Sequence, residues 1–391
     1  MSEPGRVPDA APRRDAVFGV AAAGTFAAAL GIAGVTIPLL AVSVGYSATE
    51  IGMLVAVAGI TQMLARLHLG PLMRKFPDKQ LVIAATIALA LSTAILFVST
   101  TLFAFVLSQL FQGIARAYFW TGNQTHAVRT SHSPARALAL LNYGSGAGSL
   151  IAPLIAGLLY EYSALYAFAL ATVFALLSTL TGVLLIQLRP FAPLSSIEDR
   201  PTGRLWRRPA VRDALVMSTA TGAWWGLLGS YVPVLLVFSG QSATTIGILV
   251  TVATFGALLG NAVISTWRPN NRTLLILGLT SIGLGLAALG PLGHLAFAAA
   301  LTLAISGLGA GALQTIAPVI ATESSHSEES GDAIATTGMV RAGTLLVTPI
   351  AVAGIVLVAP VSVAFVAVGL LIFSPTLLRL GPDDKHGPTS A

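Results

Sequence analysis

Residues 38–58 read PLLAVSVGYSATEIGMLVAVA, and residues 233–253 repeat them as PVLLVFSGQSATTIGILVTVA at an offset of 195. The two stretches keep proline (Pro38, Pro233), glycine (Gly45, Gly240) and a Ser-Ala-Thr triplet in register. A shared apolar composition does not place such residues in register, whereas self-similarity at a fixed offset is typical of duplicated architectures. The sequence therefore predicts a chain built from two related halves.

The composition around this repeat is that of a membrane protein. Of the 391 residues, 55% are hydrophobic and 9% are charged, with a mean hydropathy of +0.84. A soluble domain has about 25% charged residues, and a disordered chain has low hydrophobicity and high net charge. The absence of cysteine from the sequence excludes disulfides, thiolate metal sites and cysteine nucleophiles.

Twelve stretches are long and apolar enough to cross a bilayer, which takes about 20 residues in a helix. Because backbone amides in lipid must be satisfied internally, we expect helices. The predicted fold class is all-α integral membrane, with twelve transmembrane helices in two pseudo-symmetric six-helix bundles. The stretches are 17–40, 48–69, 81–98, 102–124, 137–159, 163–187, 214–237, 243–265, 273–290, 293–319, 332–355 and 358–378.

The loops between these stretches predict the orientation. Lys and Arg fall on one side only, as cytoplasmic loops require, and this bias explains the net charge of +6. We expect a cytoplasmic tail (1–16), a first bundle (17–187), a cytoplasmic linker (188–213), a second bundle (214–378) and a cytoplasmic tail (379–391). The polar tail shows no cleavage site, so the first span is expected to stay in the mature protein of the cell membrane.

Twelve spans, parallel halves and a basic linker resemble the major facilitator superfamily of transporters. In its motif after the second span, Gly-x-Leu-Ala-Asp-Arg-x-Gly-Arg-Lys, this chain matches at Gly70, Leu72 and Lys79. Arg74 stands at the Asp position and Asp78 at an Arg position. The resemblance implies a conformational role for Gly70 and Asp78, and a substrate site between halves that rock against each other.

The fifth span resembles the exporters of this family. Their pattern of Gly, three residues, Gly-Pro, two residues and Gly-Gly is met by Gly148, Ala152-Pro153 and Ala156-Gly157. The resemblance implies a conformational role for Gly148, Pro153 and Gly157, and it favours export. The alternative is ordinary close packing of helices through small residues.

Charged residues inside the spans predict a binding site, because an ionisable group at the centre of a span is costly and is retained for a role. All fifteen acidic residues fall at span ends, in loops or in tails, whereas Arg66, Arg116 and Arg341 lie within spans. Arg66 is near a span end, where its side chain can reach water, and we expect it to be structural.

The two deeper arginines belong to polar helix faces from opposite halves. Arg116 shares a face with Gln109, Gln112, Trp120 and Asn123, and Arg341 shares one with Thr337, Thr344 and Thr348. Such faces must meet protein or water. We hypothesise that Arg116 and Arg341 bind a carboxylate or phosphate of the substrate. The alternative is that each braces neighbouring helices through carbonyl or amide groups.

Aromatic and amide residues predict the rest of this cavity. Trp224 and Trp225 lie in the middle of the seventh span, away from the interfaces that lipid-facing tryptophans prefer. Adjacent residues of a helix face differently, so at most one of them is expected to line a cavity, and the alternative for each is packing. Further polar candidates for the lining are Asn142, Tyr143 and Gln314.

The sequence places no histidine in the middle of a predicted span and contains no cofactor motif. Of the six histidines, His126, His132 and His326 are expected in loops, His294 at the outer face and His68 near a span end. No phosphate-binding Gly-x-x-x-x-Gly-Lys loop is present, so ATP is not the direct energy source. The sequence predicts no cofactor and no metal site.

The leading hypothesis is a secondary active transporter that moves a small amphipathic molecule, anionic if the arginines bind it, by alternating access and in the direction of efflux. Proton or counter-anion coupling are both open. The alternatives are an organic-anion uptake permease, an anion exchanger or facilitator, and a non-transporting receptor. An enzyme is not predicted, because no span offers an acid–base or metal constellation. The expected partners are the substrate and the bilayer, not nucleic acid, and the expected state is a monomer.

Overall fold

The computed structural model describes residues 10–131, 133–190, 205–267, 269–325 and 330–377. Within these ranges the chain forms helices and loops and no strand, which confirms the predicted all-α class. His132, His326, most of the predicted linker and the C-terminal tail lie outside the described residues.

Fourteen α-helices and one 3-10 turn make up the described chain. In the first half they are α1 (Ala10–Ser43), α2 (Ala48–Leu67), α3 (Leu69–Lys75), α4 (Asp78–Val98), α5 (Leu102–Thr130), α6 (Pro134–Tyr162) and α7 (Ala164–Val183). In the second half they are η1 (Leu205–Arg207), α8 (Pro209–Leu228), α9 (Tyr231–Phe238), α10 (Ala243–Thr266), α11 (Asn271–Leu292), α12 (Ala296–Glu323), α13 (Ser330–Val356) and α14 (Val361–Leu377).

Each predicted span coincides with one of these helices or with a pair of them. In the described chain, ten helices are long and apolar enough to cross a membrane, α8 and α9 together make an eleventh, and α14 is a shorter apolar helix. The seventh predicted span, 214–237, consists of two helices: α8 and α9 meet at an angle of 51°. At the break, Ser230 Oγ donates to Gly226 O at 2.5 Å, so a side chain takes up a carbonyl that the helix leaves free.

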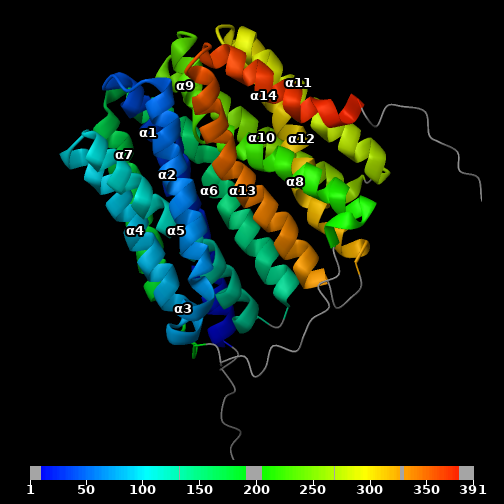
Figure 1. The fold of residues 1–391 in the computed structure, drawn as a ribbon. Helices are drawn as coiled ribbons and strands as arrows, with labels where there is room; N and C mark the ends of the chain where they lie inside the picture. Colours follow the sequence, from blue (N-terminus) through cyan, green and yellow to red (C-terminus); the bar gives the residue numbers. More distant parts are fainter. Residues whose placement is uncertain (1–9, 132, 191–204, 268, 326–329, 378–391) are drawn as a thin grey trace, which may run out of the picture.

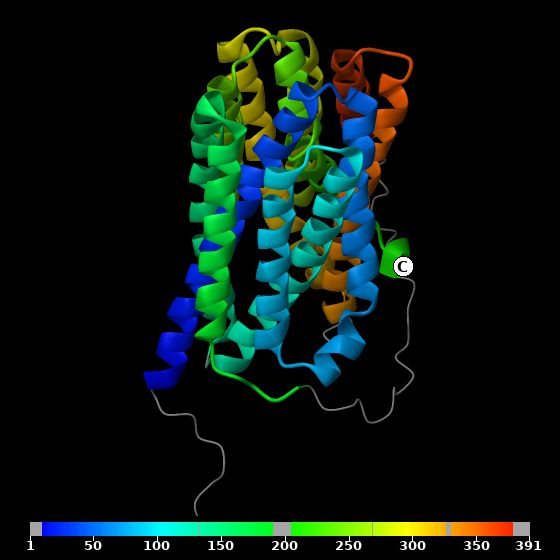
Figure 2. The ribbon, with the colours of Figure 1, turned by 90° about the vertical axis from the view of Figure 1, so that its left-hand side faces the viewer.

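The helices of each half pack with one another (Figures 1 and 2). In the first half α1 contacts α6 and α7, and α5 contacts α2 and α4; in the second half α12 contacts α10 and α11, and α8 contacts α13. Glycines allow the closest approaches, since a Cβ on Gly148 or Gly144 of α6 would collide with the facing backbone of α1. The apolar core extends through both halves.

The duplicated stretch keeps its geometry. Gly45 and Gly240 both have positive φ, at 94° and 81°, where glycine is favoured. In each half the helix ends in a Schellman motif, with Tyr46 N donating to Ala41 O and Gln241 N to Leu236 O, both at 3.0 Å. Ser47 and Ser242 then cap the next helix through their hydroxyl oxygens.

The two halves meet towards one end of the bundle. We call this the outer end; its loops (44–47, 99–101, 163, 239–242, 293–295 and 357–360) contain no Lys or Arg. The opposite, inner end carries the basic loops. Contacts between halves run along α6 with α10 and along α2 with α13. A Cβ on Gly52 or Gly157 at the outer end would collide with the other half, and Figure 1 shows the halves diverging towards α3.

Candidate substrate cavity

A cavity of about 420 Å³ lies between the two halves. Its wall is built from α1, α2, α5 and α6 of the first half and from α8, α10, α12 and α13 of the second. The lining includes three arginines and, within the part of the chain that the structure describes, no acidic residue and no histidine. The polar and aromatic lining residues are Gln62, Arg66, Arg116, Trp120, Ser145, Ser149, Trp225, Thr254, Gln314 and Arg341.

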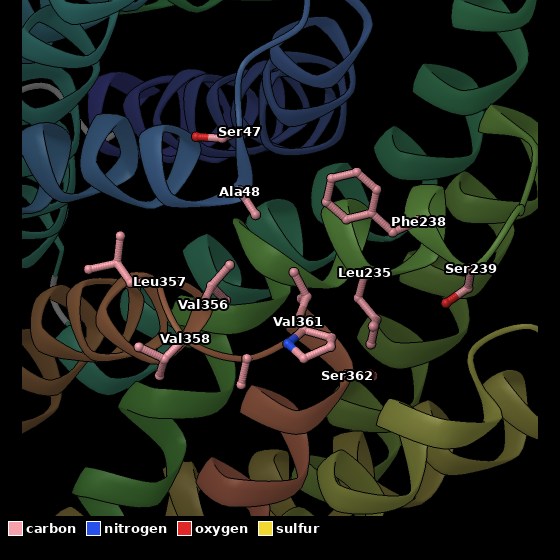
Figure 3. Close-up of a pocket in the computed structure, with 12 residues that line it drawn as sticks. Ser47, Ala48, Leu235, Phe238, Ser239, Val356, Leu357, Val358, Val361 and Ser362 are labelled. Atoms are coloured by element: carbon pink, nitrogen blue, oxygen red, sulfur yellow. The ribbon is translucent and has the colours of Figure 1, made fainter.

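A larger hollow of about 680 Å³ lies at the outer end. Figure 3 shows its wall, in which Ser47 and Ala48 at the start of α2 face Leu235 and Phe238 of α9 and the 356–358 segment. No charged side chain lines it. Because this hollow offers only apolar groups and hydroxyls, the central cavity is the candidate substrate site.

The arginines of the central cavity come from both halves. Arg116 Nη2 donates to Gln112 Oε1 at 2.8 Å, one helical turn away in α5, while its buried Nε has no partner among the described residues. Arg66 and Arg341 make no hydrogen bond or ion pair with the described part of the chain. Three guanidinium groups without a carboxylate therefore give this cavity a positive field.

Aromatic residues form the apolar side of the cavity. Trp225 lies in the wall and its Nε1 donates to Gln314 Oε1 at 2.5 Å, which joins α8 to α12. Trp120 of α5 is in the opposite half and packs edge-on against Phe26, with ring centroids 5.8 Å apart. The cavity can hold an apolar body between these rings and a charged group at the arginines.

Of the residues predicted to bind substrate, five line this cavity and six do not. The five are Arg116, Trp120, Trp225, Gln314 and Arg341. Among the others, Gln109 and Gln112 are buried in α5, at 2% and 4% exposed, and Thr337 is buried with its hydroxyl on Ile334 O. Asn142 and Tyr143 are exposed near the inner end of α6.

The two adjacent tryptophans have different surroundings, as expected for neighbouring positions of a helix. Trp225 lines the cavity, whereas Trp224 is 1% exposed and its Nε1 donates to Ser306 Oγ at 3.1 Å in α12. The two rings meet edge to face, with centroids 4.9 Å apart. Trp224 thus packs α8 against α12 behind the wall that Trp225 forms.

Sequence reasoning missed part of the lining. Arg66 was expected to be structural, yet it lines the cavity together with Gln62, one helical turn before it in α2. The polar pair at i and i+4 was the available signal, since the same spacing on α5 singled out Gln112 and Arg116. The serines of α6, Ser145 and Ser149, carry no comparable signal because small residues also serve packing.

The residues predicted to have conformational roles lie in different surroundings. Gly157 meets the backbone of Gly247 across the two halves, and Pro153 both lines the cavity and presents its carbonyl to Gly247. Gly148 instead packs on Gly24 within the first half. Gly70 is exposed, and a Cβ there would have nothing within 4 Å.

Asp78 belongs to a buried charge cluster at the inner end of the first half. Arg129 Nη1 donates to both of its carboxylate oxygens, at 2.8 and 2.9 Å. His126 Nε2 lies 2.5 Å from Asp15 Oδ2, and its Nδ1 is 3.9 Å from Asp78. The expectation that His126 lies in a loop is wrong: α5 continues to Thr130, because these partners satisfy polar residues that hydropathy alone places outside a span.

Comparisons with known proteins agree with this architecture. Residues 19–349 match the model of the family described as Major Facilitator Superfamily. The tetracycline resistance protein, class C, of Escherichia coli is 27% identical over 331 residues, which cover 78% of this chain and 80% of that protein.

Two solved structures of POT family transporters share the fold. One, in complex with 5-aminolevulinic acid, has a TM-score of 0.74 at 13% identity and covers 93% of this chain and 95% of its own. The other, in complex with a thioalcohol-conjugated peptide, has a TM-score of 0.73 with the same identity and coverage. The resemblance inferred from the sequence is confirmed, and the chain belongs to the Major Facilitator Superfamily of secondary transporters.

Proposed function

We propose that this transporter moves a small amphipathic anion by alternating access, in the direction of efflux. The observation that carries the proposal is the central cavity, in which Arg66, Arg116 and Arg341 face a common space without an acidic residue in the wall. A carboxylate or phosphate is the chemical group that unpaired guanidinium groups bind best. Trp120 and Trp225 supply apolar faces for the remainder of the molecule.

The membrane orientation in this proposal follows the positive-inside rule. The basic inner end faces the cytoplasm, and both termini lie there, in the cell membrane. The cavity then faces the cytoplasm in the present conformation, because the halves meet at the outer end. The bundles 17–187 and 214–378 rock as units, and a monomer is sufficient because both halves of the site come from one chain.

Two features support efflux as the direction. The fifth span carries the exporter-like residues Gly148, Pro153 and Gly157, two of which lie where the halves touch. The E. coli relative is named for resistance to tetracycline, and resistance fits the export of a compound. Uptake of an organic anion is the second candidate, because a positive cavity serves either direction.

Substitution of the arginines tests the proposal. We expect Arg116→Gln and Arg341→Gln to abolish counterflow of an amphipathic anion such as naphthylacetate in proteoliposomes, and Arg→Lys at each site to retain part of it. Arg212→Gln is the matched control, because it removes the same charge from an exposed position on α8 outside the cavity wall. Counterflow that is unchanged in both cavity variants would contradict the proposal.

A further inference from the structure

Arg66 and Arg341 are two like charges that line the central cavity from opposite halves. Arg66 belongs to α2 and Arg341 to α13, and both line the central cavity. The wall of this cavity, in the described part of the chain, contains no acidic residue that could compensate them. Neither has a hydrogen-bonded or ion-paired partner in the described ranges of the chain. Charged residues within membrane spans are usually paired with an opposite charge, so two arginines without such a partner indicate a functional site.

The pair lies just beyond the contact between these two helices. Going inward, α2 touches α13 first where Gly52 meets Ala353 and then where Gly59 meets Leu346. Arg66 follows Gly59 by seven residues, which is about 10 Å of helix. Arg341 precedes Leu346 by five residues, about 8 Å in the same direction because the helices are antiparallel. Along the helix axes both arginines lie inward of this contact, and closing the inner end would bring the two helix ends that carry them closer together.

Arg116 does not share this position. It lies in α5 of the first half, and a hydrogen bond from its side chain to Gln112 holds it there. Arg66 and Arg341, in contrast, lie on α2 and α13, two helices that pack against each other across the halves. Movement of one half against the other changes the separation of this pair directly.

We propose that Arg66 and Arg341 form a single anion site across the two halves, and that this site controls closure of the inner end. The inference rests on the proposed anionic substrate. In the empty transporter, repulsion between the guanidinium groups holds α2 and α13 apart at the inner end. An oxyanion group placed between them accepts hydrogen bonds from both and turns the repulsion into attraction.

An anion site that controls closure has a consequence for the transport cycle. The substrate must bind the closed arrangement better than the open one, which is the condition for a ligand to shift such an equilibrium. The loaded transporter closes its inner end readily, while the empty transporter does so rarely. Transport is then an exchange of anions across the membrane, and net movement without an anion on the return path is slow. Among the modes of coupling left open by the sequence, this favours counter-anion exchange.

A set of charge-reversal variants, studied without substrate, tests whether these two arginines control closure. The four proteins are the wild type, Arg66→Glu, Arg341→Glu and the double variant. Positions 66 and 341 carry two positive charges in the wild type, opposite charges in each single variant and two negative charges in the double variant. We expect both single variants to close at the inner end, because opposite charges attract. We expect the double variant to reopen, because like charges return. A merely structural role for either arginine predicts no such recovery.

Spin-label distances report the result. The chain has no cysteine, so labels can be placed without background. Gln80→Cys on α4 and Ile334→Cys on α13 put exposed labels on the two halves at the inner end. Val98→Cys and Val358→Cys, 89% and 88% exposed, do the same at the outer end. The inner distance should shorten in both single variants while the outer distance lengthens, with Arg212→Gln unchanged.

The two proposals fail in different ways. The outer-end distance distributions show whether each protein is folded. If all four folded proteins have the same inner distance, the electrostatic control of closure is overturned, but the proposal of an anionic substrate is not. If the four proteins show the expected distance changes but the wild type shows no counterflow of anions, the proposed function is contradicted instead. A shortening in only one single variant would also overturn the inference, because repulsion is a property of the pair.

Discussion

The hydroxyl of Tyr231 in α9 donates a hydrogen bond to the backbone oxygen of Ala48 in α2, at 2.9 Å, and so joins the two halves at the outer end. Tyr231 is fully buried. Gly52 lies beside it, and a Cβ at that position would collide with the tyrosine hydroxyl and with Ala353. The short helix α9, which meets α8 at 51°, thus places a polar contact where the halves must separate during transport.

Replacement of this tyrosine should loosen the outer end. Tyr231→Phe removes one hydrogen bond between halves, about 1 kcal/mol, which corresponds to a roughly fivefold rise in the population open to the outside. The Val98 and Val358 label pair measures that population. Tyr46→Phe is the control, because the Tyr46 hydroxyl bonds to Thr100 O within the first half. Equal shifts in both variants would contradict the account.

A larger residue at Gly157 should prevent the outer end from closing. A Cβ there would collide with Ala243 O and would lie 3.0 Å from the Gly247 Cα, both in the other half. We expect Gly157→Val to fold, to stay open to the outside and to lose transport. Gly354→Val is the matched control, because nothing in α13's surroundings lies within 4 Å of a Cβ at that position. Alkylation of cysteines at the outer end measures the difference, and transport at wild-type rates by Gly157→Val would refute the prediction.

The charge cluster of the first half should govern stability rather than binding. Asp78 is fully buried and accepts two hydrogen bonds from Arg129. Removing one partner of a buried ion pair costs on the order of 3–5 kcal/mol, because the other charge is left uncompensated. Asp78→Asn should therefore lower the melting temperature markedly, with anion affinity unchanged in the folded fraction. Arg74→Gln, at an exposed position of α3, should leave the melting temperature unchanged.

The two adjacent tryptophans should separate affinity from stability. Trp225→Ala removes an aromatic face from the cavity and leaves Gln314 Oε1 without its donor, so we expect weaker binding of an amphipathic anion. Trp224→Phe keeps a ring behind the wall but removes the buried bond to Ser306 and part of the buried side-chain volume, so it should lower the melting temperature without weakening binding. Isothermal titration of the purified variants distinguishes the two effects, and the reverse pattern would be evidence that Trp224 is the ligand-facing residue.

Much of the fold could be predicted because its determinants are local in the sequence. The in-register repeat around Gly45 and Gly240 predicted two halves, and the structure keeps the same helix end and cap in both. Apolar length located the spans, but it could not place their ends. Residues such as His126 extend α5 because partners on α1 and α4 satisfy them, and those partners are distant in sequence.

The candidate site was predictable only in part, because its lining depends on how helices that are distant in the sequence pack together. Helical spacing showed which face of α5 carries Arg116 and Trp120, and both line the cavity. It did not show that Gln109 and Gln112 turn into the bundle, because a face of a helix is wider than the cavity it meets. Arg66 was assigned to the span end from its position alone, whereas its surroundings depend on how α13 lies against α2.

Ligand-induced thermal stabilisation of the purified protein tests the central claim most directly. Naphthylacetate, naphthylethanol and naphthylethylamine offer similar apolar bodies with a negative, neutral or positive group. We predict that the anion raises the melting temperature most, and that this advantage disappears in Arg116→Gln and Arg341→Gln but not in Arg212→Gln. Greater stabilisation by the cation, or by all three equally, would contradict a cavity built to receive negative charge.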